Sequence, residues 1–351
     1  MKVLFLAVGP DNVASSRGRV YQFLGYLREA NITTKVIPFT SRKAAHKAIN
    51  NIRLGFAEKT LERMYNIASF VKVAFLCRGF DAIFIQKTCL PVTFFALIKR
   101  LNDNIVFDFD DAIFDSKVNP GTRRLKRFGF TLKNCKHVIA GNAYLKERAI
   151  DLNDKVSVII TPVDTDRLFP NGENRVLKKE VVIGWIGSPD TCGYLHDLRG
   201  VFQTLISRYD GVRFEFVGAD AFYKGLSGFT IKEWSFARES EDLRNFDIGV
   251  MPLNNNEWSR GKCGYKLLQY MAVGIPCVAS PTGVNTELVK NGVNGFLAGS
   301  EDEWIEKLSI LNEDDNLRIR MGLEGRKRAE VAYSYNVIAP RLIDCLKEIS
   351  A

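Results

Sequence analysis

Short apolar runs alternate with longer amphipathic segments along the chain of 351 residues. Runs of about four to eight apolar residues predict buried strands, and apolar positions recurring every three or four residues predict amphipathic helices. In the first half, strands are predicted at 3–8, 34–38, 82–86, 104–108 and 137–140, with a helix at 19–30. Such alternation predicts a parallel sheet covered by helices on both faces.

The alternation is interrupted once and then restarts. After a strand at 158–160, residues 171–180 are polar and carry no periodic pattern, which indicates a linker. The second half predicts strands at 181–186, 213–217, 247–251 and 276–279, and helices at 195–209, 264–272, 301–312, 314–331 and 336–349.

The predicted fold class is α/β, with two tandem Rossmann-like, doubly wound domains facing a cleft. Ligands of such sheets bind beyond the carboxyl ends of the strands. We expect an N-terminal domain at 1–168, a linker at 169–180 and a C-terminal domain at 181–335. Residues 336–351 are expected to form a helix that packs back on the N-terminal domain.

The positive charge is unevenly divided between the two halves. The formal net charge is +9, of which residues 1–170 carry +12 and residues 171–351 carry −3. An excess on one domain favours an anionic surface or ligand. Its densest segments, 41–63 and 117–136, interleave basic and apolar residues, which suits an anionic membrane surface or a solvated helix face.

Several classes of protein are disfavoured. The seven cysteines are scattered without C-x-x-C spacing, so we expect reduced thiols of a cytosolic protein. No apolar run reaches the roughly 20 residues that span a bilayer. No G-x-G-x-x-G follows a strand, which argues against a nicotinamide-dependent enzyme. No zinc-finger, aromatic RNP-type or helix-turn-helix pattern indicates nucleic-acid binding, although polyanion binding stays open as an alternative function.

A basic loop rich in glycine precedes the helix predicted at 264–272. Its glycines let backbone N–H groups approach an anion at the helix N-terminus, and two lysines add charge there. A diphosphate and ribose site is one interpretation, and a solvated loop before a core helix is the other. The residues concerned are Gly261, Lys262, Gly264, Tyr265, Lys266 and Gln269, with the glycine loop Gly187 and Ser188 after an earlier strand.

The stretch Lys-Cys-Gly-Tyr-Lys-Leu-Leu-Gln-Tyr-Met-Ala at 262–272 resembles the signature of family 4 glycosyltransferases with the GT-B fold. It is similar to the subgroup found among bacterial surface-polysaccharide transferases. Gly261 and Gln269 stand where the family's E-x7-E motif has its two glutamates. Segments 160–170, 183–188 and 280–297 are similar to further family segments in the same order.

The resemblance implies an enzyme that transfers a sugar with retention of configuration from a UDP-, GDP- or ADP-sugar. The implied acceptor is a glycan or a polyprenyl-diphosphate-linked glycan, in the synthesis of O-antigen, capsule or exopolysaccharide. It implies no tightly bound cofactor and no divalent metal. The implied location is the cytoplasm, with peripheral binding to the inner face of the cytoplasmic membrane. A GT-B scaffold without strong catalysis is the alternative.

The first domain supplies the remaining candidates. Ser15, Ser16, Arg17 and Arg19 open the first helix, where they either bind an anion or only cap the helix. Three carboxylates follow the strand at 104–108, and such crowding needs a cation, an arginine, sugar hydroxyls or Mg²⁺ nearby. We assign substrate binding to the four helix residues with Asp108 and Asp110, and catalysis to Arg17, Asp110, Asp111 and Lys266.

Overall fold

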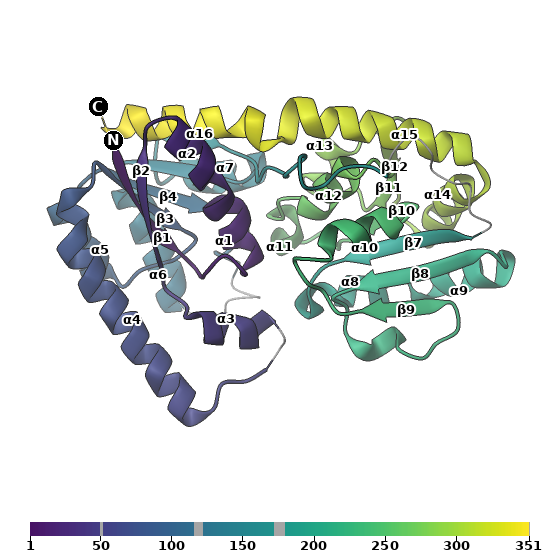
Figure 1. The fold of residues 1–351 in the computed structure, drawn as a ribbon, viewed down its shortest axis with the longest axis horizontal. Helices are drawn as coiled ribbons and strands as arrows, with labels where there is room; N and C mark the ends of the chain where they lie inside the picture. Colours follow the sequence, from purple (N-terminus) through teal and green to yellow (C-terminus); the bar gives the residue numbers. More distant parts are fainter. Residues whose placement is uncertain (50–51, 116–121, 172–179, 351) are drawn as a thin grey trace. The chain divides into compact units, whose positions relative to one another are not determined.

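The computed structural model describes residues 1–49, 52–115, 122–171 and 180–350. The chain forms two compact units (Figure 1). Unit 1 comprises Met1–Thr161, Arg260–Cys263 and Asn336–Ala351, and unit 2 comprises Pro162–Ser259 and Gly264–Tyr335. Most of the predicted linker, residues 172–179, lies outside the described residues.

Unit 1 is built on a parallel sheet with the strand order β2-β1-β3-β4-β5-β6. The strands are β1 (Lys2–Ala7), β2 (Thr33–Pro38), β3 (Ala82–Gln86), β4 (Ile105–Phe109), β5 (His137–Ala140) and β6 (Val156–Val158). Residues 3–7 of β1 are fully buried because helices cover both faces of the sheet. The connection from β1 leads to β2 on one side of β1, and the next connection leads to β3 on the other side. The carboxyl ends of β1 and β3 therefore form a topological switch point.

The helices of unit 1 are α1 (Ala14–Arg19), α2 (Leu24–Glu29), α3 (Arg42–Ile49), α4 (Phe56–Leu76), α5 (Val92–Leu101), α6 (Thr122–Asn134), α7 (Ala143–Ile150) and α16 (Tyr335–Ser350). The helix predicted at 19–30 is two helices joined by a 3₁₀ turn at Tyr21–Phe23. It breaks because Val20 has φ −130° and ψ −65°, outside the helical region.

Unit 2 repeats the architecture with the parallel order β12-β11-β10-β7-β8-β9. Its strands are β7 (Val181–Ile186), β8 (Val212–Val217), β9 (Phe229–Lys232), β10 (Ile248–Met251), β11 (Cys277–Ala279) and β12 (Gly295–Leu297). The sequence did not predict β9 and β12. Both are short edge strands with partly exposed residues, so neither produces a continuous apolar run.

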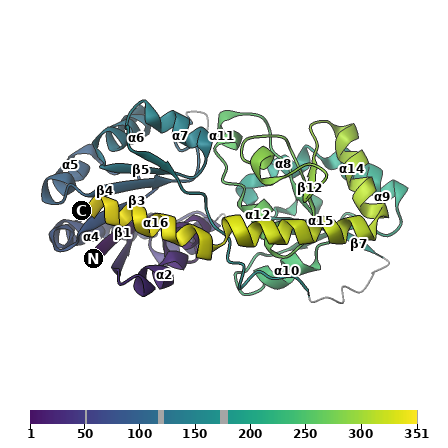
Figure 2. The ribbon, with the colours of Figure 1, turned by 90° about the horizontal axis from the view of Figure 1, so that it is seen from above.

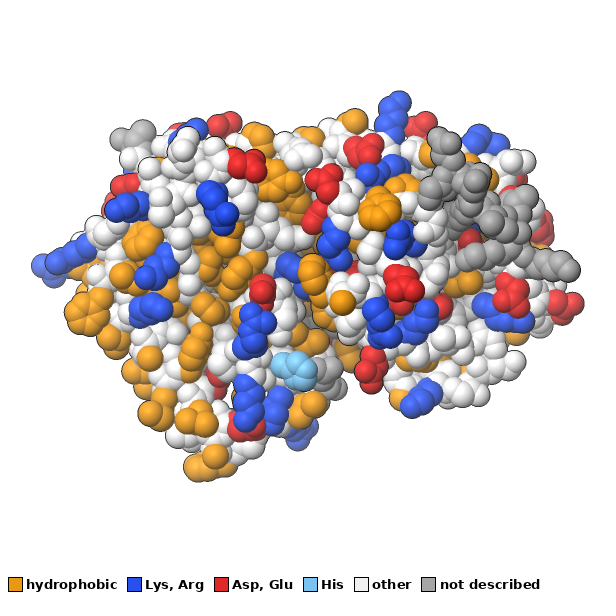
Figure 3. Space-filling model, in the orientation of Figure 1, with side chains coloured by type: hydrophobic (Ala, Val, Ile, Leu, Met, Phe, Trp, Pro, Cys, Tyr) orange, Lys and Arg blue, Asp and Glu red, His pale blue; other side chains and the backbone are white. Residues whose placement is uncertain are grey.

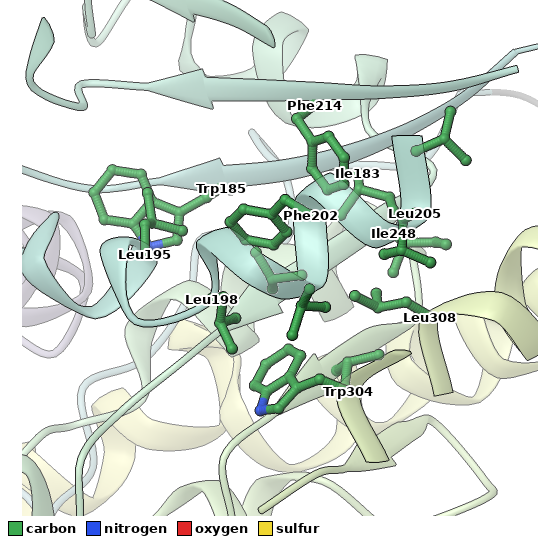
Figure 4. Packing of buried hydrophobic residues seen from close by; sticks show 14 of the residues in the cluster. Ile183, Trp185, Leu195, Leu198, Phe202, Leu205, Phe214, Ile248, Trp304 and Leu308 are labelled. Carbon is green, nitrogen blue, oxygen red and sulfur yellow. The ribbon is translucent and has the colours of Figure 1, made fainter. Parts of the chain in front are cut away.

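The helices of unit 2 are α8 (Gly193–His196), α9 (Arg199–Arg208), α10 (Glu239–Asn245), α11 (Glu257–Arg260), α12 (Tyr265–Ala272), α13 (Asn285–Leu288), α14 (Glu301–Glu313) and α15 (Asp315–Arg328). Side chains of α9 and α14 fill one core against the sheet (Figure 4). Phe202 of α9 lies 4.6 Å from Phe214 of β8 between ring centroids, and Trp304 of α14 is 3% exposed. This aromatic core packs against β7 and β8.

Most of the last helix, α16, belongs to unit 1. Lys136 donates from Nζ to the carbonyl oxygen of Ile349 at 2.7 Å, and Arg341 donates to the carbonyl oxygen of Val158 at 3.0 Å. Figure 2 shows α16 running along the strands of unit 1. None of the described helices is both long enough and apolar enough to cross a membrane.

Candidate functional site

The predicted residues of unit 1 meet at the switch point between β1 and β3. Gln86 ends β3 and is fully buried, and its Oε1 accepts from the backbone N–H of Val8 at 3.0 Å and from Ser16 Oγ at 3.1 Å. Its Nε2 donates to Ser15 Oγ at 2.8 Å, and Ser15 Oγ donates to the carboxylate of Asp110 at 3.2 Å. Neither serine caps α1, because Val13 is the N-cap residue. Both instead fix the loop after β1 to the ends of β3 and β4.

Arg19 and Asp108 form a closed ion pair. Arg19 donates from Nε to Asp108 Oδ2 at 3.1 Å and pairs with Oδ1 through Nη2, and its Nη1 donates to the carbonyl oxygen of Ile159 at 2.7 Å. The side chains are 2% and 0% exposed, so the pair is sealed from solvent. Burial raises the pKa of Asp108, and the adjacent guanidinium opposes that rise. The structure therefore pairs two predicted substrate-binding residues with each other inside the protein.

Lys87, which sequence reasoning missed, sits among the remaining carboxylates. Its Nζ lies 3.3 Å from Asp110 Oδ1 and forms a hydrogen-bonded ion pair with Asp111. The backbone is left-handed with φ +55°, a conformation that costs a lysine about 1 kcal/mol. Burial works to lower the pKa of Lys87, but Asp110 and Asp111 raise it above its usual value. Lys87 is therefore a fixed cation at the end of β3.

Lys262 completes this group from a distant part of the sequence. Its Nζ donates to Asp111 Oδ1 at 3.3 Å, and its carbonyl oxygen accepts from Asn142 Nδ2 at 3.0 Å. Burial works to raise the pKa of Asp111, yet Lys87 and Lys262 lower it below its usual value. The side chains of Lys87, Asp111 and Lys262 remain 17–18% exposed, so they are partly accessible to solvent, in contrast to Asp108.

Gly261 stands where a glutamate of the family motif would be, and local packing explains the glycine. A Cβ atom at this position would lie 2.7 Å from the backbone nitrogen of Ala112 and 2.6 Å from its Cβ. Backbone cannot yield as a flexible side chain can, so any larger residue would push the segment 260–263 away from Ala112.

Gly261→Glu should therefore destabilise the protein by about 1–3 kcal/mol, since the overpacked loop must shift. Urea unfolding measures the change, with Gly193→Glu as the control because no atom lies within 4 Å of a Cβ at Gly193. Equal stability of the two variants would contradict the close approach of residues 261 and 112.

In unit 2, the predicted donor residues surround the N-terminus of α12. Gly264 precedes the helix with φ +68°, and no side chain caps the helix there. A Cβ at Gly264 would lie 2.4 Å from Leu288 Cδ1, so both the backbone conformation and the space require glycine. The first N–H groups of a helix have no partner within the helix, and the macrodipole favours an anion beside them.

The end of β7 lies against the first turn of this helix. Lys266 places Nζ 5.1 Å from the ring centroid of Trp185, which positions the ammonium group. A Cβ at Gly187 would lie 2.9 Å from Lys266 Cε, and a Cβ at Gly218 would lie 2.2 Å from the carbonyl oxygen of Gly187. Glycines thus permit the strand ends, the loop with Ser188 and α12 to approach closely. Gln269, one turn further on, is 3% exposed.

The structure thus gathers the candidates into two groups. Ser15, Asp110, Asp111 and Lys262 come together in unit 1 with Lys87, whereas Gly187, Gly264 and Lys266 come together in unit 2. The polar pair Gln86 and Lys87 at the end of a buried strand was the available signal for Lys87. In the described ranges, no group of three or more His, Cys, Asp or Glu is arranged to hold a metal ion. Cationic side chains contact the crowded aspartates.

Comparison with protein families finds a match in the second half of the chain. Residues 180–314 match the family model described as "Glycosyl transferases group 1". The matched residues are thus similar to group 1 glycosyltransferases. Among curated proteins, Glucosyltransferase 3 of Streptococcus parasanguinis is 24% identical over 198 residues, which cover 52% of this chain and 59% of that protein. The match therefore spans about three fifths of the relative's length.

Solved structures extend the likeness to the whole chain. Sucrose-phosphate synthase from Thermosynechococcus elongatus has a TM-score of 0.76 at 13% identity and covers 99% of both chains. Anabaena HepE in complex with UDP-glucose has a TM-score of 0.72 at 16% identity and covers 99% of this chain and 100% of its own. The predicted fold class, two Rossmann-like α/β domains of the GT-B type, is confirmed, and the family match supports the predicted transferase class.

Proposed function

We propose that this protein transfers a sugar, with retention of configuration, from a nucleotide-sugar to a glycan or lipid-linked glycan. The observation that carries the proposal is the N-terminus of α12, where Gly264 and Lys266 stand beside Gly187 of the β7 loop. Backbone N–H groups, a helix dipole and an ammonium group in one place suit a diphosphate.

UDP is the nucleotide that we propose for the donor. HepE, which shares the fold over nearly the full length, is described in complex with UDP-glucose. A Staphylococcus aureus structure with a TM-score of 0.60, TarM, is described with UDP, alpha-GlcNAc-glycerol and fondaparinux. At 15% identity and 59% coverage of that protein, the likeness supports a glycan-type acceptor as a class and leaves the individual sugar undefined.

The chemistry that we propose for unit 2 is stabilisation of the leaving group. Cleavage of the donor bond places negative charge on the diphosphate. Lys266 and the N–H groups of α12 meet that charge where it develops, and preorganised donors of this kind lower the barrier. The departing diphosphate then accepts the proton of the attacking hydroxyl on the same face, through an oxocarbenium-like state without a protein nucleophile.

For unit 1 we propose that Asp110 and Asp111 hold acceptor or donor hydroxyls. Lys87 and Lys262 keep Asp111 ionised, and Ser15 orients Asp110, so both carboxylates accept hydrogen bonds in a fixed direction. Arg17 stays a proposed contact to an anionic acceptor. Arg19 and Asp108 position the loop after β1 from within the protein.

The acceptor that we propose is a polyprenyl-diphosphate-linked glycan of a cell-surface polysaccharide, which places the enzyme at the inner face of the cytoplasmic membrane. The basic surplus of the first half supports this location. On α6, Arg123, Arg124 and Lys126 are exposed, whereas residues 117–121 of the same basic segment lie outside the described residues. Unit 1 thereby offers positive charge to a lipid diphosphate or to anionic headgroups.

A thermal-shift panel tests the donor proposal. UDP at a hundredfold excess over its Kd should raise the unfolding midpoint by roughly 3–8 °C, because a ligand that binds only the native state stabilises it. GDP, ADP and inorganic phosphate serve as matched controls. No response to any nucleotide would contradict the donor site and favour the scaffold or polyanion-binding alternative.

A further inference from the structure

The solvent-facing side of α4 is apolar along the length of the helix. Phe56 is 89% exposed and Phe75 is 83% exposed, at opposite ends of the helix. Between them, four large apolar side chains are each at least half exposed: Leu61, Met64, Ile67 and Val71. Space-filling shows hydrophobic side chains gathered over α4 and α5 (Figure 3). Isolated exposed apolar residues are ordinary, but a continuous patch marks an interaction surface.

The charges of α4 are sorted around this face. At 3.6 residues per turn, the exposed apolar positions form one continuous arc, with Lys59 and Arg63 along one edge and Lys72 along the other. The two carboxylates of the helix turn the opposite way. Glu58 pairs with Lys47 of α3 at 2.6 Å, and Glu62 accepts from the backbone N–H of Ser41 at 2.9 Å. The outer face therefore offers apolar groups and cations.

Helix α5 continues the same surface. Phe70 of α4 packs on Phe94 of α5 with ring centroids 4.5 Å apart, so the two helices are neighbours. The exposed positions of α5 are Val92, Thr93, Ala96, Leu97 and Arg100. Again the outer face combines apolar residues with a cation, and the described residues of α4 and α5 expose no carboxylate on it.

The combination of apolar residues and cations on the outer face of α4 and α5 favours one kind of binding partner over another. A second copy would bring the same cations against each other without a carboxylate to match them, because a twofold interface pairs a surface with itself. A bilayer with anionic headgroups matches both parts of the surface, since apolar side chains enter the acyl boundary and cations meet phosphates. We propose that the outer face of α4 and α5 lies in the plane of an anionic lipid bilayer.

The proposal deepens the membrane location given above and names the residues that make it. It makes the apolar arc of α4 the main contact. Lys59 and Arg63 from the basic segment 41–63, together with Lys72, are the flanking contacts to phosphates. In this proposal α4 lies along the membrane surface as an interfacial helix, because an apolar face flanked by cations suits that position. This arrangement would hold unit 1 beside a lipid-linked acceptor.

Vesicle flotation tests the proposal with the full chain. Wild-type protein should float with vesicles of mixed phosphatidylcholine and phosphatidylglycerol, and less with phosphatidylcholine alone. Ile67→Ser combined with Val71→Ser should weaken binding at least about tenfold, because two apolar side chains no longer enter the bilayer. The matched control is Ile319→Ser with Leu323→Ser on α15, which removes exposed apolar residues of the same spacing from unit 2.

Three readouts separate the outcomes. Loss of flotation in the α4 variant alone, with an unchanged unfolding midpoint, supports the proposal. Absence of wild-type flotation, equal loss in both variants, or a dimer that the α4 variant dissociates would overturn it. The UDP-induced thermal shift should be the same in all variants, so failure of membrane binding is distinguishable from failure of the proposed donor site.

Discussion

Replacing Lys266 by alanine should lower glycosyl transfer about a hundredfold to a thousandfold, which is the usual cost of removing one preorganised donor from a developing negative charge. The ammonium group stands in the first turn of α12 and is positioned by the ring of Trp185. Initial rates with UDP-sugar donors measure the change, and UDP thermal shifts report whether the diphosphate contact is lost as well.

Stability should hardly change in this variant, because the contact between the ammonium group and the ring contributes only about 0.5–1 kcal/mol at a partly exposed site. Lys290→Ala is the matched control, since Lys290 is an exposed lysine of the same unit. Near-normal transfer by Lys266→Ala, or equal losses in both variants, would contradict the assignment of the diphosphate site to α12.

Replacing Arg19 by leucine should destabilise the protein by about 3–5 kcal/mol, because it leaves the carboxylate of Asp108 buried without its partner. Arg42→Leu serves as the control, since its ion pair with Asp11 is exposed and should matter by about 0.5 kcal/mol or less. Urea unfolding of both variants measures the difference.

The loss in Arg19→Leu should depend on pH. Burial raises the pKa of Asp108, and removing the guanidinium takes away the main group that opposes the rise. A group whose pKa is raised in the folded state binds its proton more tightly there, so the variant is least impaired at low pH. The destabilisation should therefore grow as pH rises from about 4 to 7. A loss that is constant with pH would contradict an ionised pair, and Arg19→Leu with Asp108→Leu should recover much of the stability.

The proposed diphosphate site at the N-terminus of α12 could be anticipated from local sequence. Gly264 and Lys266 lie within three positions of each other, and the turn, the helix start and the cation are all properties of one short segment. The left-handed φ of Gly264 and the start of α12 at Tyr265 follow from the residues themselves. Gly187 was predicted with them because a glycine loop after a buried strand is also a local pattern.

The proposed binding site around Asp110 and Asp111 in unit 1 could be anticipated only in part. The crowded aspartates required compensating groups, but their sequence did not say which groups compensate them. Arg19 pairs with Asp108 across 89 positions, Lys87 with Asp111 across 24, and Lys262 with Asp111 across 151. Such pairings depend on which strand ends become neighbours in the sheet. The available signal, a polar pair at the end of β3, did not reveal that Lys87 turns toward the aspartates through a left-handed backbone.

The short edge strands also depend on contacts with distant parts of the chain. Central strands such as β1 are buried on both faces and therefore appear as apolar runs, whereas β9 and β12 rely on a neighbouring strand for their backbone hydrogen bonds. The predicted helix 19–30 is likewise interrupted at Val20, next to Arg19, which pairs with Asp108 of β4. In both cases the segment makes contacts with another part of the chain.

By itself the sequence determined the α/β class, the positions of the central strands along the chain and the glycine-bounded helix α12, because periodicity, burial and turn chemistry act over a few residues. Tertiary structure alone decided that Gly261 must be small, that the aspartates are matched by Arg19, Lys87 and Lys262, and that the apolar face of α4 points outward. These outcomes depend on groups far apart in the chain, whose approach is set by sheet order and packing rather than by neighbouring residues.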